Sequence, residues 1–152
     1  MADTQFDCFL VEKDAAGNVR RGIAQRSLGD LPLGEVLVRV QFSSLNYRDA
    51  LASQAHPGVV RKLPHVPGID AAGVVAESTD PRVKQGDAVV ITGYELGAGQ
   101  WGGWSQFVRV PADWVVPLPA GLSHKETMIL GTAGFTAAQC VHAILLNEVK
   151  PS

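Results

Sequence analysis

Two short segments of this chain carry polar side chains whose types could do chemistry together. Asn46, Tyr47 and Asp49 lie within four residues, and Asp70 follows in a second segment rich in small residues. A carboxamide donates and accepts hydrogen bonds, a protonated phenol donates them, and a carboxylate accepts them and orients donors. Zn²⁺ prefers thiolate, imidazole or carboxylate ligands, and a carboxamide is a poor substitute. These residue types therefore favour a site that works by hydrogen bonding.

Each of these side chains also has a purely structural interpretation. Asn46 precedes a short helical pattern and is a typical N-cap residue. Tyr47 fits an amphipathic side chain packed at a strand end. Asp49 and Asp70 fit carboxylates that accept backbone N–H groups. The residues alone leave both interpretations open.

Composition excludes several classes of partner. Of the 152 residues, 46% are hydrophobic and 18% are charged, with a net charge of -2, so there is no electrostatic basis for binding nucleic acid or an anionic membrane. No apolar run is expected to reach the length of a membrane span. The start of the chain lacks the basic and apolar regions of a signal peptide, so a cytoplasmic location is expected.

The cysteines and histidines do not form a metal-binding pattern. Without a secretory signal, Cys8 and Cys140 are expected to be two buried, reduced thiols. The four histidines show no ligand spacing with one another: His56, His65, His124 and His142. No metal site is therefore predicted.

The first two thirds of the chain reads as strands separated by Gly/Pro turns. Residues 35–42 alternate in hydrophobicity, which is the period of a half-buried strand. The expected strands are 6–12, 19–24, 35–42, 73–77, 87–91, 107–110 and 114–118. Short strands at this spacing predict a β-barrel or sandwich.

Helical patterns begin near residue 123. Ser123 followed by Glu126 predicts a capping box at the start of a helix, and a second helical pattern follows residues 131–134. The fold class is therefore mainly β with a few helices. The glycines of residues 97–102 have the spacing of a dinucleotide fingerprint, but a strand follows them where a helix is required, so we do not assign that function.

Four segments in register carry a family resemblance over essentially the whole chain. They are residues 43–51, 67–75, 101–103 and 131–137. Together they resemble the zinc-free acryloyl-CoA reductase / YhdH-type quinone oxidoreductase group of the medium-chain dehydrogenase/reductase superfamily.

This resemblance implies an architecture and the absence of zinc. Residues 1–122 would form a GroES-like, partly open catalytic β-barrel, and residues 123–152 a helical connection to a Rossmann domain that this chain lacks. In zinc-dependent members, a cysteine stands at the position of Asn46 and a histidine at that of Ile69. Neither residue here is a usual zinc ligand.

The resemblance also implies a function. It is NADPH-dependent hydride transfer to the β-carbon of an α,β-unsaturated acyl thioester such as acryloyl-CoA. The alternatives are an NADPH:quinone oxidoreductase or, for the isolated fragment, a non-catalytic barrel that holds no nucleotide tightly. The full-length protein is expected to be a homodimer acting on a small molecule.

The site residues follow from the same resemblance. Asn46, Tyr47 and Asp49 are the expected catalytic residues, with Asn46 donating a hydrogen bond to the oxygen that becomes negative. Tyr47 and Thr132 are expected to contact NADPH. Asp49 and Asp70 are expected to lie near Asn46 and either to orient it or to pair with Arg48.

Overall fold

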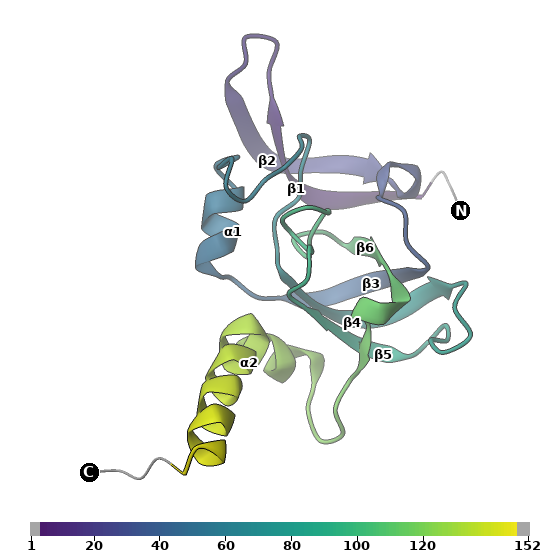
Figure 1. Cartoon of the computed structure of the whole chain (residues 1–152). Helices are drawn as coiled ribbons and strands as arrows, with labels where there is room; N and C mark the ends of the chain where they lie inside the picture. Colours follow the sequence, from purple (N-terminus) through teal and green to yellow (C-terminus); the bar gives the residue numbers. More distant parts are fainter. Residues whose placement is uncertain (1–3, 149–152) are drawn as a thin grey trace.

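A computed structural model describes residues 4–148 and contains two antiparallel sheets (Figure 1). A long hairpin pairs β1 with β2, and a five-stranded sheet has the order β6-β3-β4-β5-β7. The strands are β1 (Gln5–Lys13), β2 (Val19–Ser27), β3 (Val36–Ser43), β4 (Asp70–Ser78), β5 (Ala88–Thr92), β6 (Phe107–Val110) and β7 (Val116–Pro117). The predicted fold class, mainly β with few helices, is confirmed.

Two apolar clusters hold the sheets together. In β3, Val36 and Val38 are completely buried, but Leu37 between them is also buried and Phe42 is exposed, so the expected alternation holds only in part. They form the main core with residues from the other strands of the five-stranded sheet, including Ile91 of β5 and Val108 of β6. A second cluster, which includes Phe6 of β1, joins the hairpin to the sheet.

Two α-helices and two short 3₁₀ turns complete the fold. The helices are α1 (Tyr47–Ala52) and α2 (His124–Leu146). The capping box that starts α2 is confirmed, because Ser123 Oγ accepts from Glu126 N at 3.3 Å and Glu126 Oε2 accepts from Ser123 N at 2.8 Å. Gly131 interrupts α2 with φ 51° and ψ -157°, so the two helical segments expected on either side of this region are present.

Two sequence expectations are corrected. The last strand is shorter than predicted, because residues 112–114 form a 3₁₀ turn after Pro111 and only residues 116–117 join the sheet. Cys8 and Cys140 are both free thiols, but only Cys8 is buried, whereas Cys140 is exposed on α2. The part of α2 after Gly131 leaves the barrel (Figure 1), and residues 135–146 of this part are exposed.

The apolar character of α2 also differs from the expectation. By length and composition α2 could cross a membrane, with a mean hydropathy of 1.6 in an 18-residue window that is 6% buried. The break at Gly131 divides this helix. At 1.5 Å per residue, the part after Gly131 is about 22 Å long, shorter than the roughly 30 Å of a bilayer core.

The proposed domain boundary between residues 122 and 123 stays a prediction.

The glycines of residues 97–102 have a packing role in this fold. A Cβ on Gly97 would lie 2.6 Å from the backbone carbon of Gly68, and Gly97 has a φ of +67°. Gly102 N donates to Val66 O at 2.7 Å, and Gly103 N donates to Gly68 O at 2.8 Å. Close backbone contact therefore accounts for these glycines.

A buried histidine makes the stability of the barrel depend on pH. The His65 ring donates from Nε2 to Gly97 O at 2.9 Å, and burial lowers the pKa of His65 below its usual range. The unfolded state therefore binds more protons below about pH 6.5. We expect the melting temperature to fall as the pH drops from about 6.5 through the lower pKa of the folded state.

A thermal melt series against pH tests this expectation. His65→Gln removes the titrating group while its amide can still donate to Gly97 O, so its melting temperature should be less sensitive over the same pH interval. Equal pH sensitivity in both proteins would show that another group is responsible.

Candidate functional site

Asp70, the first residue of β4, is the centre of a polar cluster. Its carboxylate is fully buried and accepts hydrogen bonds from the Ser44 hydroxyl and from Asn46 Nδ2 at 2.9 Å. It also accepts from Thr132 N at 3.1 Å and Thr132 Oγ1 at 2.6 Å. We call Ser44, Asn46, Asp70 and Thr132 the Asp70 cluster. Three segments far apart in the sequence meet there.

The break in α2 brings Thr132 to this carboxylate. Gly131 lies in a region of backbone conformation that is essentially open only to glycine. A Cβ at this position would lie 2.8 Å from Asp70 Oδ2. The N–H and hydroxyl that follow the break both point at Asp70, which satisfies an N–H at the start of the second helical part in the manner of an N-cap.

Asn46 occupies the N-cap position of α1, but its side chain is directed into the cluster. Its Nδ2 donates to Ser44 Oγ at 2.8 Å and to Asp70, with a longer bond of 3.3 Å to Asp49 Oδ2. The capping box of α1 also pairs the Asn46 side chain with the backbone N–H of Asp49. The expected role of Asn46 as a donor to substrate stays a prediction; in this structure its Nδ2 is hydrogen-bonded to protein oxygens.

Asp49 is also completely buried and fixes two segments against each other. Its Oδ1 accepts from Gly68 N at 3.0 Å and Ile69 N at 2.9 Å, and its Oδ2 accepts from Asn46 N at 2.8 Å. Burial raises the pKa of Asp49, although the bonds from these donors act in the opposite direction. Its expected catalytic role stays a prediction; its contacts are those of a positioning residue.

Tyr47 is the expected site residue whose hydroxyl is not bound by the described part of the protein. It is the first residue of α1 and is 81% exposed. Within the described part of the chain, its hydroxyl has no hydrogen-bond partner. The phenol is therefore free to donate to a bound molecule, which the donors of the Asp70 cluster are not.

An apolar pocket of about 460 Å³ borders the cluster at Thr132. Its wall includes Tyr94 and Trp114, whose rings are stacked with centroids 5.3 Å apart and planes 5° apart. Tyr94 has a positive φ of 52°, which is uncommon outside glycine, and its hydroxyl donates to Asp113 O at 3.3 Å. The pocket is lined by Thr92, Gly93, Tyr94, Trp114, Val116, Thr132, Phe135 and Thr136.

The sequence analysis did not single out Tyr94. Its only signal was its place directly after a strand and a glycine, and such positions are common in turns. Its pairing with Trp114 depends on the 3₁₀ turn at residues 112–114, whereas the expected strand began at residue 114.

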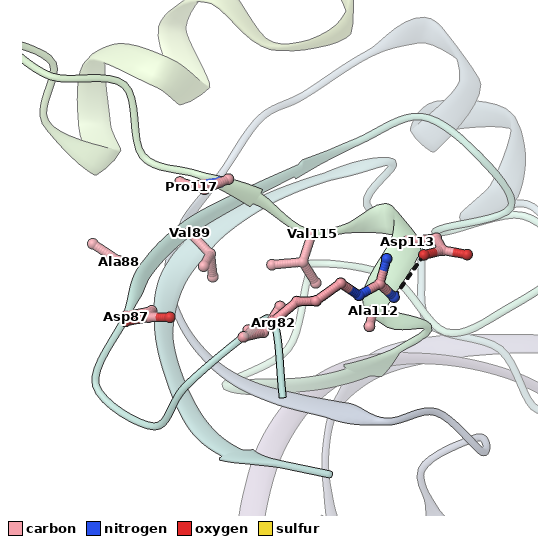
Figure 2. Close-up of a pocket in the computed structure, with 9 residues that line it drawn as sticks. Arg82, Asp87, Ala88, Val89, Ala112, Asp113, Val115 and Pro117 are labelled. Atoms are coloured by element: carbon pink, nitrogen blue, oxygen red, sulfur yellow. Dashed lines mark hydrogen bonds and ion pairs between the residues drawn. The ribbon is translucent and has the colours of Figure 1, made fainter. Parts of the chain in front are cut away.

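A larger pocket of about 520 Å³ contains none of the expected site residues. Figure 2 shows that the Arg82 side chain extends toward Asp113, with which it forms an ion pair, and that Val89 and Val115 also line the pocket. Arg82 also binds Asp80 at 2.8 Å, so its charge is neutralised by the protein. This pocket is not lined by any residue of the Asp70 cluster.

The donor set of the site does not fit zinc. Ile69 is buried and has no donor atom in its side chain, and the nitrogen of Asn46 is bound to protein oxygens. No group of three or more His, Cys, Asp or Glu side chains within residues 4–148 is placed to hold a metal ion. A tetrahedral site of thiolate and imidazole ligands therefore has no counterpart among these residues.

Comparison with known proteins places the chain in a family. Residues 32–120 match the alcohol dehydrogenase GroES-like domain. The acrylyl-CoA reductase AcuI of Ruegeria pomeroyi is 51% identical over 96% of this chain and 44% of its own length. The chain thus spans less than half the length of this relative.

Two solved structures have the same fold at high similarity. The yhdH oxidoreductase of Salmonella enterica, in complex with NADP, is 42% identical with a TM-score of 0.90, covering 97% of this chain and 45% of that one. The yhfP protein of Bacillus subtilis, with NAD bound, is 47% identical with a TM-score of 0.91, covering 99% and 45%. With its GroES-like sheet and its match over residues 32–120, the chain belongs to the alcohol dehydrogenase GroES-like domain family, within the medium-chain dehydrogenase/reductase superfamily.

Proposed function

We propose that this chain is the substrate-facing part of an NADPH-dependent, zinc-independent reductase. The substrate class is an α,β-unsaturated acyl thioester such as acryloyl-CoA. The observation that carries this proposal is the Asp70 cluster, in which Asn46, at a position where zinc-dependent members carry a cysteine, is hydrogen-bonded to Asp70 and Ser44. The similarity to an acrylyl-CoA reductase supports the choice of substrate.

The pocket beside Thr132 fits the reaction. It is apolar, about 460 Å³ in volume, and bounded by the flat Tyr94–Trp114 stack, which suits a planar ring or a short unsaturated acyl group. When bound, NADPH supplies the hydride that adds to the β-carbon. Thr132 lines the pocket and is held by Asp70, so its contact surface toward the cofactor is fixed.

Stabilisation of the developing charge is assigned to Tyr47. After the hydride adds, the π electrons move toward the thioester carbonyl, whose oxygen becomes negative, and a proton then completes the α-carbon. A free hydroxyl donor lowers the energy of that charge in the manner of an oxyanion hole. Tyr47 is exposed and has no partner within residues 4–148, whereas the amide hydrogens of Asn46 are bound.

We expect Tyr47→Phe in the parent protein to lower kcat about a hundredfold with little change in KM. The substitution removes only the hydroxyl and keeps the ring. Steady-state assay of NADPH oxidation with acryloyl-CoA measures both constants. An unchanged kcat would remove Tyr47 from the chemical step.

The parent protein is proposed to carry a nucleotide-binding domain and to act as a homodimer. NADPH oxidation by the parent with acryloyl-CoA tests the reductase assignment, and oxidation with neither acryloyl-CoA nor a quinone would sink it. The 152-residue chain alone is expected to show no turnover. Measurable turnover by this chain would contradict that expectation.

A second candidate function is quinone reduction. The Bacillus subtilis relative YhfP, 47% identical over 97% of this chain, is provisionally named a quinone oxidoreductase. The flat aromatic wall of the pocket also suits a quinone ring. Comparison of kcat/KM for the two substrates in one assay decides between them.

Zinc independence has its own test. We expect metal analysis of the purified protein to find far less than one zinc per chain, because the site lacks thiolate and imidazole donors. Activity should survive dialysis against a chelator. Stoichiometric zinc that is lost together with activity would overturn this part of the proposal.

A further inference from the structure

A pocket of about 350 Å³ is built from three segments that are far apart in the sequence. They are the turn after β2, the segment before β4 and the loop before β6, and no residue of the Asp70 cluster lines the pocket. Trp101 Nε1 donates to Pro64 O at 3.0 Å, and His65 Nε2 donates to Gly97 O at 2.9 Å. These two bonds tie the second segment to the third, so the wall between them is fixed.

The side-chain N–H groups around this pocket are already bound to backbone carbonyls. Gln100 Nε2 donates to Leu33 O and to Arg109 O, both at 3.1 Å, and the single N–H of the Trp101 indole is bound to Pro64. A carbonyl oxygen can only accept, so these bonds fix the direction of the Gln100 amide and leave its Oε1 as an acceptor. No group in the described part of the chain donates to this oxygen, and it is not among the buried unpartnered atoms.

His65 and Asp30 add two more acceptors to the pocket. His65 Nε2 carries the hydrogen that binds Gly97 O, and burial lowers the pKa of His65, so its Nδ1 is unprotonated at neutral pH. His65 is 2% exposed, and no donor within residues 4–148 binds Nδ1. Asp30 Oδ2 accepts from Ser27 N at 2.8 Å, whereas Asp30 Oδ1 receives no donor from the same range of residues.

Two further features narrow the class of ligand. Lys62 is exposed and lines the pocket, and it forms no ion pair with any of residues 4–148, so its ammonium is available to an anion. The Trp101 indole, held by Pro64, supplies an aromatic surface in the wall. A ligand that matches this pocket has a planar ring, several hydrogen-bond donors and a negative charge.

We propose that this pocket binds an adenine nucleotide. The base stacks on Trp101, and the phosphate binds Lys62. The amino group of the base and the ribose hydroxyls donate to the acceptors of Asp30, His65 and Gln100. The volume of about 350 Å³ is in the range of small-molecule sites.

Titration of the 152-residue chain with adenosine 5′-monophosphate tests the site. The chain has three tryptophans, Trp101, Trp104 and Trp114, so ¹⁵N labelling gives three indole N–H signals, and Trp101→Phe identifies one of them by its loss. We expect the Trp101 signal to shift and saturate, with the signal of Trp114, in the pocket beside Thr132, unmoved. No shift of the Trp101 signal up to about 10 mM nucleotide would overturn the proposal. A shift confined to Trp114 would contradict it equally.

Purine riboside 5′-monophosphate is the matched ligand control, because it lacks only the amino group of the base. We expect its dissociation constant to be about tenfold larger, since the acceptors of the pocket lose a donor. Equal binding of the two nucleotides would show that the pocket does not recognise adenine.

Lys62→Gln tests the phosphate contact. It should weaken binding of adenosine 5′-monophosphate about tenfold and leave binding of adenosine, which has no phosphate, unchanged. Lys84→Gln is the matched control, because it removes an exposed lysine that does not line the pocket, and it should leave both affinities unchanged. Equal weakening by the two substitutions would show that only the overall charge attracts the nucleotide, which contradicts the site.

The adenine nucleotide can come from two sources. One is a free nucleotide, and the other is the adenosine phosphate head of a CoA thioester, a source that rests on the proposed function. Coenzyme A is therefore the second probe in the same titration. Tighter binding of coenzyme A than of adenosine 5′-monophosphate assigns the head of the substrate, whereas equal or weaker binding assigns the free nucleotide.

Failure of this proposal differs from failure of the proposed function. Absence of NADPH oxidation by the parent protein would sink the reductase assignment and leave the nucleotide site standing. A Trp101 signal that responds to neither probe would sink the site even if the parent protein is an active reductase.

Discussion

Replacing Asp49 with alanine is expected to lower the free energy of unfolding by about 3 kcal/mol. The substitution leaves the N–H groups of Gly68 and Ile69 buried without their acceptor, and it removes the carboxylate that accepts from Asn46 N at the start of α1. Each unmade bond in a buried site costs of the order of 1–3 kcal/mol. Chemical denaturation of the 152-residue chain, read by tryptophan fluorescence, measures the change.

Asp113→Ala is the matched control for this variant. It also removes a carboxylate, but the side chain of Asp113 is 77% exposed and its bond to Arg82 is a surface ion pair. Such pairs contribute about 0–1 kcal/mol. Equal destabilisation by the two substitutions would show that Asp49 does not fix α1 to the segment before β4.

Gly131→Ala is the second substitution with a large expected effect. A side chain at this φ costs about 1–3 kcal/mol, and its Cβ would lie 2.8 Å from Asp70 Oδ2. We expect loss of stability together with displacement of Thr132 from Asp70. The first is read by denaturation and the second by a shift of the Thr132 amide resonance.

Gly22→Ala provides the comparison for Gly131. Gly22 lies in β2, and a Cβ there would meet no atom within 4 Å. The change should leave stability within about 0.5 kcal/mol and leave the Thr132 resonance unmoved. A Gly131→Ala protein as stable as wild type would mean that the helix break tolerates a side chain.

The sequence predicted the elements of the fold well, because their signals are local. Alternation located β3, and the Ser123–Glu126 pair located the start of α2. The extent of β7 was wrong, because Pro111 begins a 3₁₀ turn that alternation does not reveal. The apolar window within α2 was not noticed in the sequence, because its hydropathy is spread over many small residues.

The sequence predicted which residues form the site better than it predicted the hydrogen bonds between them. Asn46 and Asp70 were expected to lie together, and they do. The bond between Thr132 and Asp70 joins residues 62 positions apart, and it depends on the conformation of Gly131. Ser44 was not expected in the site, yet its hydroxyl donates to Asp70 and accepts from Asn46 Nδ2.

The two parts of the interrupted helix α2 differ in how they are held. The part before Gly131 is clamped to the sheet through Met128, which packs with Ala72 and Val90, and the part after it projects from the barrel (Figure 1). The second part is a helix about 22 Å long. A rotation of about 10° at the break would move its far end by about 4 Å. The hydrogen bonds from Thr132 to Asp70 lie at this break, so they hold the start of the second part against β4.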